Sequence, residues 1–248
     1  MTHAIPGRGP VAEALRAGRP LTEVVVDERS GPALDALAQT ARDDGVSVRR
    51  ADRTTLDQLS GGVLHQGVVA VAESFRYTPI TKFPETSLVV VLDGVTDPQN
   101  LGAIARSAEA AGAVGLVLRE RRGAHVTPAA EKASAGALSW LSVAMVPNVV
   151  RALSDLADRG FWSVGLAGEA EATLWEAPLL DGPVAVVIGG EGAGLSRLVR
   201  ERVDGLLRIP MVGSMTSLNA SAASALALFE VVRRRAAAGN AAGVRGAH

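Results

Sequence analysis

Hydrophobic residues recur along most of the chain in short uninterrupted runs, of which 88–92 (LVVVL) is the clearest. Such runs are typical of strands buried on both faces of a parallel sheet. They alternate with stretches of helical period, which favours an α/β fold. From residue 88 onwards we expect strands at 88–92, 115–118, 139–146, 162–166 and 184–188, and helices at 98–111, 148–159, 196–203 and about 219–235.

The first 75 residues show a smaller α/β pattern. The segment 21–26 (LTEVVV) is rich in β-branched residues and predicts a strand. Residues 74–87 carry two prolines and many hydroxyl side chains, which indicates a linker. We therefore expect a small domain at 1–75, a linker at 76–87, and a second domain at 88–248 with a frayed tail at 239–248. The small domain has expected strands at 21–26, 46–50 and 67–72, and expected helices at 10–17 and 32–42.

Composition excludes several classes of protein. Lys and Arg total 25 against 26 Asp and Glu, a net charge of -1, which rules out coating nucleic acid by bulk charge. The chain has no cysteine, which excludes disulfides, thiolate zinc sites and cysteine nucleophiles. With four histidines we expect no metal site. No apolar stretch is long enough to span a membrane and no signal peptide is evident, so we expect a cytoplasmic protein.

The first candidate site is 93–106 (DGVTDPQNLGAIAR), which runs from a strand into a helix. Asp97 is suited to cap that helix, and Pro98 to be its first residue. Arg106 lies away from the apolar face of the helix. It is either a solvated arginine paired with Glu109 or a substrate-binding group, because the small Gly102 one turn earlier admits a close approach.

The second candidate is 184–196 (VAVVIGGEGAGLS), a buried strand followed by a loop with four glycines. Ligands of parallel α/β sheets bind outside the carboxyl ends of the strands. The dinucleotide pattern GxGxxG fails because Leu195 stands where the third glycine would be needed, and a Walker pattern is absent. Glu191 is either a solvated loop residue or a carboxylate of the site.

The third candidate is 209–221 (IPMVGSMTSLNAS), which precedes the last expected helix. Ser217 is a plausible N-cap. The free N–H groups of a helix N-terminus suit an anion. Alternatively, the segment is a well-capped helix start and nothing more.

Taken together and in order, these segments resemble the three signature motifs of the SpoU-type RNA 2′-O-methyltransferases of the knotted SPOUT class. The segments 7–15 (GRGPVAEAL) and 65–67 (HQG) resemble the substrate-binding domain of the ribosomal RNA members, especially the 23S guanosine 2′-O-methyltransferases. The resemblance spans nearly the whole chain. In one departure, Gly9 stands where that branch usually has asparagine.

The resemblance implies a C-terminal domain with a trefoil knot that binds S-adenosylmethionine without a metal, and a homodimer formed through the last helix and the first-motif helix. It also implies methyl transfer to a ribose 2′-OH of RNA, at a guanosine of 23S rRNA. The site residues that it implies fall into two groups. Catalytic roles go to Arg106, Asn100, Glu191, Ser217 and Asn219, and cofactor binding to Leu166, Gly168, Gly189, Gly190, Ile209, Met211 and Leu218.

Several alternatives stay open at this stage. Within the family, the substrate is alternatively a tRNA. Outside it, the chain is a non-catalytic RNA-binding or ribosome-assembly factor, or a nucleotide-dependent oxidoreductase, which the failed GxGxxG pattern disfavours. The role of Arg106 is also open, because a guanidinium stays protonated. It acts either as a base in a special environment or as a phosphate anchor.

Overall fold

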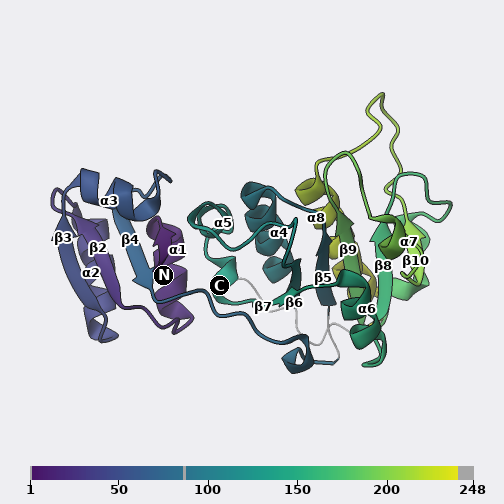
Figure 1. Cartoon of the computed structure of the whole chain (residues 1–248), viewed down its shortest axis with the longest axis horizontal. Coiled ribbons are helices and arrows are strands. Elements are labelled where there is room, and N and C mark those ends of the chain that lie inside the picture. The colour runs from purple at the N-terminus through teal and green to yellow at the C-terminus, as the bar shows by residue number, and fades with distance from the viewer. Residues whose placement is uncertain (1, 86–87, 240–248) are drawn as a thin grey trace. The chain divides into compact units, whose positions relative to one another are not determined.

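The computed structural model describes residues 2–85 and 88–239, which form two compact units (Figure 1). The smaller unit comprises residues up to 77 together with 97–106 and 125–141, and the larger unit comprises the rest. Residues 86–87 of the predicted linker and 240–248 of the predicted tail lie outside the described residues.

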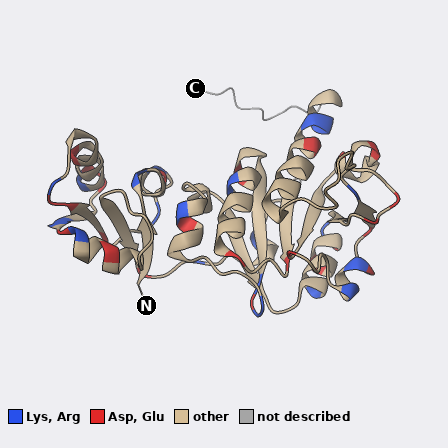
Figure 2. Ribbon diagram, turned by 90° about the horizontal axis from the view of Figure 1, so that it is seen from above, with Lys and Arg blue, Asp and Glu red and all other residues tan. Residues whose placement is uncertain are grey.

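The larger unit is built on a six-stranded sheet in which every neighbouring pair is parallel. This confirms the predicted α/β fold. Its strands carry almost no charged residues (Figure 2), as expected for strands covered on both faces. In spatial order the strands are β10 (Gly205–Leu207), β8 (Trp162–Leu166), β9 (Val184–Gly189), β5 (Leu88–Asp93), β6 (Ala113–Arg119) and β7 (Ser142–Val146).

The strand order changes direction between β5 and β9. The chain leaves β5 towards β6 on one side, and it leaves β9 towards β10 on the other. Such a reversal opens a crevice at the carboxyl ends of the two central strands, where ligands of open α/β sheets bind. The first two predicted motifs follow β5 and β9, so both start at this point.

Helices cover both faces of the larger sheet. On one face α6 (Val149–Ala157) and α7 (Arg197–Arg200) pack over a shared core that includes Val91, Val117 and Val187. The last helix, α8 (Ala220–Ala237), contacts β9 from the opposite face (Figure 1).

Part of the predicted linker is fixed to the core of the larger unit. Ile80 and Phe83, in and beside the short 3₁₀ turn η1 (Ile80–Lys82), are buried in the same core as α6. Arg159 donates hydrogen bonds to the carbonyl oxygens of both residues. Residues 78–83 therefore behave as packed structure and not as a free connection.

The smaller unit contains a four-stranded sheet in the order β1 (His3–Pro6), β4 (Val68–Ala72), β2 (Glu23–Asp27) and β3 (Ser47–Ala51). Only β2 and β3 are parallel. Helices α1 (Arg8–Arg16) and α2 (Pro32–Asp43) pack on one face, and α3 (Arg53–Ser60) packs on the other through Leu56.

Two helices from later in the sequence belong to this smaller unit. They are α4 (Pro98–Ala110) as far as Arg106 and the short α5 (Pro128–Ala133). They touch at Gly102, where a Cβ would lie 2.4 Å from the Cβ of Ala133 and 2.5 Å from the carbonyl oxygen of Ala130. Glycine therefore lets α4 lie directly against α5.

Several sequence predictions need correction. The strand expected at 139–146 starts only at Ser142, because 137–139 form a 3₁₀ turn. The helix expected at 196–203 ends at Arg200, since Asp204, the residue before β10, turns away to bond with Ser163 of β8. Among strands and α-helices of the described residues, the prediction missed β1, α3, α5 and β10.

Candidate functional site

Asp93 joins the first two predicted motifs at the carboxyl edge of the larger sheet. It is the last residue of β5, and it is 2% exposed. Its Oδ2 accepts a hydrogen bond from the N–H of Ser196 at 2.6 Å, and its carbonyl oxygen accepts one from the N–H of Gly190 at 3.0 Å. Arg119 Nη1, at the end of β6, lies 3.7 Å from Oδ1. Asp93 thus fixes the glycine loop to the strand ends, a role that sequence analysis missed.

The glycine loop lies against the backbone of its neighbours. A Cβ on Gly190 would lie 2.2 Å from the carbonyl oxygen of Gly94, and one on Gly189 would lie 2.2 Å from the carbonyl carbon of Gly194. The first two glycines of the loop are therefore needed for close packing. By contrast, a Cβ on Gly192 or Gly194 would have no atom within 4 Å, although both residues have positive φ. That side of the loop is open.

We expect Gly190→Ala to lower the free energy of unfolding by about 1–3 kcal/mol, because the new methyl group displaces the backbone at Gly94 or Gly190. Urea unfolding measures this change. Gly182→Ala is a matched control, since its Cβ would meet nothing within 4 Å and its φ is not positive. Equal stability of the two variants would contradict the close packing of the loop.

The second and third predicted motifs meet through their side chains. Asn219 Nδ2 donates a hydrogen bond of 3.3 Å to Glu191 Oε1. Asn219 also caps α8, because its Oδ1 accepts from the N–H of Ser221 at 2.8 Å. The prediction that Ser217 caps this helix is wrong, since Ser217 lies two residues earlier in an exposed loop.

The predicted cofactor residues of the larger unit gather near this junction. Leu166 pairs with Leu207 of the neighbouring strand, and the N–H of Ala167 donates to the carbonyl oxygen of Leu207 at 3.0 Å. A Cβ on Gly168 would lie 4.0 Å from the carbonyl oxygen of Thr216, so the two loops lie side by side.

The backbone of the third motif lies outside the regular hydrogen-bond pattern. Among the described residues, the backbone between 209 and 218 makes no hydrogen bond to the backbone of another residue. The half-buried Ile209 and the part-exposed Met211 and Leu218 lie in this stretch. Free backbone groups beside apolar side chains can bind a flat, polar-edged ligand.

The remaining predicted catalytic residues lie on α4 in the smaller unit. Asp97 caps the helix, as predicted, because its Oδ1 accepts from the N–H of Gln99 at 3.0 Å. Asn100 is buried, at 6% exposure. Arg106 is exposed, and its guanidinium has no ion pair with any described residue, Glu109 included. The solvated pair with Glu109 is thus not formed.

The N-terminal segments noted in the sequence converge in the smaller unit. Lys132 Nζ lies 2.6 Å from Gln66 Oε1, and a Cβ on Gly7 would lie 2.4 Å from the same Nζ. His65 holds the second segment in a turn, since its Nδ1 accepts from the N–H of Gly67 at 3.0 Å. At Gly9 a Cβ would have only the carbonyl oxygen of Ala135 nearby, at 4.0 Å, so an asparagine fits there.

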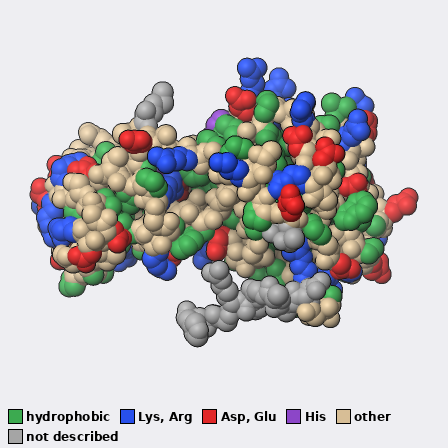
Figure 3. Space-filling model, turned by 90° about the horizontal axis from the view of Figure 1, so that it is seen from below, with side chains coloured by type: hydrophobic (Ala, Val, Ile, Leu, Met, Phe, Trp, Pro, Cys, Tyr) green, Lys and Arg blue, Asp and Glu red, His purple; other side chains and the backbone are tan. Residues whose placement is uncertain are grey.

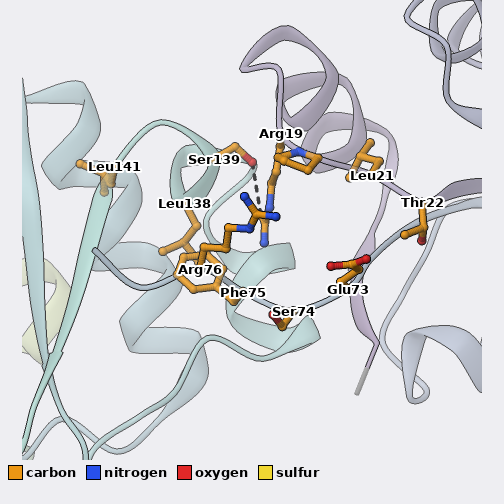
Figure 4. A pocket seen from close by; sticks show the side chains of 11 residues that line it. Arg19, Leu21, Thr22, Glu73, Ser74, Phe75, Arg76, Leu138, Ser139 and Leu141 are labelled. Carbon is orange, nitrogen blue, oxygen red and sulfur yellow. Dashed lines mark hydrogen bonds between the residues drawn. The ribbon is translucent and has the colours of Figure 1, made fainter. Parts of the chain in front are cut away.

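A buried charge cluster lies elsewhere in the smaller unit. Glu131 is fully buried, and its Oε1 lies 2.7 Å from both Arg19 Nη1 and His3 Nε2. Arg19 stacks over the ring of Phe75 at 5.0 Å. Arg19 also lines a cavity of about 320 Å³ and points towards Ser139 (Figure 4). None of the predicted site residues lines this cavity.

The described residues form neither a metal site nor a membrane-spanning helix. No three of their His, Asp or Glu side chains are grouped as a metal site would require. None of the helices in the described part of the chain has the length and hydropathy to cross a membrane.

The comparisons with known proteins agree with the geometry. Residues 87–229 match the model of the SpoU rRNA methylase family, and residues 4–78 match that of the RNA 2′-O ribose methyltransferase substrate-binding domain. A 23S rRNA (guanosine-2′-O-)-methyltransferase RlmB of Xanthomonas campestris is 44% identical over 86% of this chain and 88% of its own length. A Mycobacterium avium protein described as an uncharacterized tRNA/rRNA methyltransferase is 42% identical over 94% of this chain and 78% of its own.

Solved structures show the same relationship. The SpoU methyltransferase AviRb from Streptomyces viridochromogenes, in complex with the cofactor AdoMet, superimposes with a TM-score of 0.82 at 29% identity. The match covers 95% of this chain and 91% of that one. Since a family model spans more than half of the chain and close relatives align over most of it, the chain belongs to the SpoU rRNA methylase family.

Proposed function

We propose that the chain transfers a methyl group from S-adenosylmethionine to the ribose 2′-OH of a guanosine in 23S rRNA, in the cytoplasm. The observation that carries the proposal is the hydrogen bond between Asn219 and Glu191, which joins the glycine loop to the start of α8. The loop that precedes α8 makes no hydrogen bond to the backbone of other described residues. The family supports methyl transfer. The 23S rRNA guanosine target is supported by the RlmB relatives.

The loops at the carboxyl edge of the larger sheet fit the cofactor. S-adenosylmethionine supplies a methyl group on a sulfonium, so the protein mainly has to align the donor with the acceptor. Backbone groups of Ile209, Met211 and Leu218, which make no hydrogen bond to other described backbone groups, hold the adenine and ribose, with Leu166 and Gly168 alongside. Gly189 and Gly190 let the glycine loop lie close to its neighbouring backbone on the proposed cofactor side. The N–H of Gly190 is already bonded to Asp93, so its contribution is steric.

Polar side chains bind the RNA and position its ribose 2′-OH, which accepts the methyl group. The free guanidinium of Arg106 binds the RNA, either by holding a phosphate beside the reacting ribose or by sharing the 2′-OH proton. The buried Asn100 positions the start of α4, and Glu191, Ser217 and Asn219 shape the RNA-facing side of the glycine loop. The loops around Gly168 and Thr216 are also where we expect the chain to thread as a knot.

The motifs assign a different role to each domain. Residues 1–75 select the RNA, 76–87 connect the domains, and 88–248 carry the methyl-transfer machinery. Deleting 1–75 is a poor test, because it removes Arg19 and His3 and leaves the carboxylate of Glu131 unpaired. Point substitutions in the full chain are therefore preferable.

The function is tested by incubating the full chain with labelled S-adenosylmethionine and 23S rRNA or tRNA transcripts, with EDTA present. We expect methyl groups on ribose 2′-OH groups of guanosine in 23S rRNA, mapped by resistance to alkaline cleavage. Methylation of tRNA alone would replace the target but keep the reaction. Cofactor binding without methylation of either RNA would favour a non-catalytic RNA-binding factor, and no cofactor binding at millimolar concentration would end the proposal.

We also propose a homodimer that uses α8. Leu226 and Phe229 of α8 are 41% and 48% exposed, and with Trp175 they line a shallow apolar hollow. On the face shown in Figure 3, hydrophobic and charged side chains are mixed.

We expect Phe229→Asp to convert the dimer into monomers, because a charge buried in an apolar interface without a partner is strongly unfavourable. Light scattering across a concentration series measures the change. Leu198→Asp is the control, since Leu198 is equally apolar and exposed but lies on α7. A wild-type protein that stays monomeric would refute the dimer.

A further inference from the structure

Lys132 occupies a tight site in the smaller unit, where three separate segments of chain converge. Its Nζ lies 2.6 Å from Gln66 Oε1. It also lies where the side chain of residue 7 would point, since a Cβ there would be 2.4 Å away. The ammonium group is thus placed by glycine at position 7 and by the amide of Gln66.

The backbone around this lysine is strained. Only three non-glycine residues of the described chain have positive φ, and two of them, Gln66 at 54° and Ala135 at 52°, lie in turns beside Lys132. Gly7 has φ of 108°, which an L side chain rarely adopts. Such strain persists only when surrounding contacts enforce it, and it is concentrated at functional sites.

Positive charge is in excess around Lys132. Among residues 2–85 and 88–239, no carboxylate lies within 4 Å of Lys132 Nζ. Burial lowers the pKa of Lys132, and the nearby positive charge of Arg8 lowers it further. Arg8 itself is exposed and has no ion pair with a described residue. Arg8 follows Gly7, which lies against the ammonium group of Lys132, and two neighbouring cations without a paired carboxylate favour binding of an anion.

We propose that Lys132 and Arg8 together bind one phosphate of the RNA backbone, with Gln66 holding the ammonium group in place. The inference rests on the proposed function, which makes RNA the substrate. The ammonium group of a lysine attracts a phosphate as a compact positive charge. The guanidinium of Arg8 can donate hydrogen bonds to two phosphate oxygens at once. Contacts of this kind fix the position of an RNA without reading its sequence.

The position of Lys132 connects the proposed phosphate contact to Arg106. Lys132 lies on α5, and α5 packs directly against α4 at Gly102. Arg106 is one turn further along α4. A phosphate held at Lys132 is therefore linked through two rigidly packed helices to the residue proposed to meet the reacting ribose. Lys132 and Arg8 thus act as positioning residues, which set how the RNA lies on α4.

The test measures binding of a 23S rRNA transcript by filter retention between about 50 and 300 mM KCl. Over this range, the affinity contributed by phosphate contacts falls as the salt concentration rises. We expect Lys132→Gln and Arg8→Gln each to weaken binding at low salt by about 10-fold, as loss of a charged hydrogen bond does. Each should also reduce the slope of log affinity against log salt by about 0.7–0.9. Lys132→Arg keeps the charge and should keep the slope.

Arg16→Gln is the matched control. Arg16 lies on the same helix as Arg8, but it is 67% exposed and paired with Glu13. This variant should bind with the wild-type slope. Calorimetry with S-adenosylmethionine should give the wild-type affinity for every variant.

The outcomes separate this inference from the proposed function. If the wild type binds and methylates 23S rRNA but Lys132→Gln and Arg8→Gln keep the full salt slope, the phosphate site is wrong and the function stands. A weakened affinity with an unchanged slope would mean a purely structural role, which also overturns the inference. A wild type that neither binds nor methylates 23S rRNA overturns both. Since Arg8 is exposed, Arg8→Gln should fold even if Lys132→Gln does not.

Discussion

Arg106→Ala should slow methylation of RNA by about 10²–10⁴-fold if the guanidinium takes part in proton transfer from the 2′-OH. If Arg106 only aligns the ribose through a phosphate, the loss should be on the order of 10²-fold. Cofactor affinity should not change, because the loops proposed to hold S-adenosylmethionine belong to the larger unit and Arg106 does not. Single-turnover kinetics with 23S rRNA measure the rate, and calorimetry measures the cofactor affinity.

Arg106→Lys separates the two roles. A lysine keeps a point charge for a phosphate and should restore part of the rate. A role that needs the planar fork of the guanidinium should be lost as fully with lysine as with alanine. Arg197→Ala is a suitable control, since Arg197 is an exposed arginine paired with Glu201 on α7. Near wild-type rates for Arg106→Ala would show that Arg106 is only a solvated arginine.

The parts of the fold that follow from local pattern could be predicted. The runs that form β5 and β9 are apolar up to their last residue, and β5, β8 and β9 all start where the predicted strands start. The cap at Asp97 and the first helical residue Pro98 were also correct, because both depend only on their neighbours in sequence. The roles of individual site residues stay predictions.

What could not be predicted depends on distant partners. The element α5 has six residues and no large apolar side chain, so it carries no periodic signal, although Thr127 and Pro128 mark its start. Its importance comes from Glu131 and Lys132, whose partners His3 and Gln66 are 128 and 66 residues away in sequence. Nor does periodicity reveal that the carboxylate of Asp93 holds the N–H of Ser196.

Ser217 and Asn219 show how a local rule can choose the wrong residue. Both residue types favour the N-cap position, and they lie two residues apart. The structure selects Asn219, whose Nδ2 also reaches Glu191 while Oδ1 caps the helix. An amide can both donate and accept at one junction, which a serine hydroxyl spans less well.

Glu131→Ala should lower the free energy of unfolding by about 3–5 kcal/mol. The carboxylate is fully buried and is the acidic partner of both Arg19 and His3, and the side chain of Arg19 is only 11% exposed. Removing the carboxylate leaves a buried guanidinium without a counter-charge, which costs more than the pair itself contributed. Urea unfolding of the full chain measures the change, and Glu73→Ala is the control because Glu73 is exposed on the wall of the neighbouring cavity.

A double replacement distinguishes an unpaired charge from lost packing. In Arg19→Met with Glu131→Leu, both charges are gone and their volume is largely filled, so we expect much of the stability lost in Glu131→Ala to return. His3 still contacts Phe75 in this variant, at 5.7 Å between ring centres, so β1 keeps an apolar attachment. If Glu131→Ala combined with Arg19→Met were as unstable as Glu131→Ala alone, the cost would come from the cavity and not from the stranded guanidinium. Recovery would show that α5, and with it the helix that carries Arg106, is held in place by charge pairing that an apolar pair can replace.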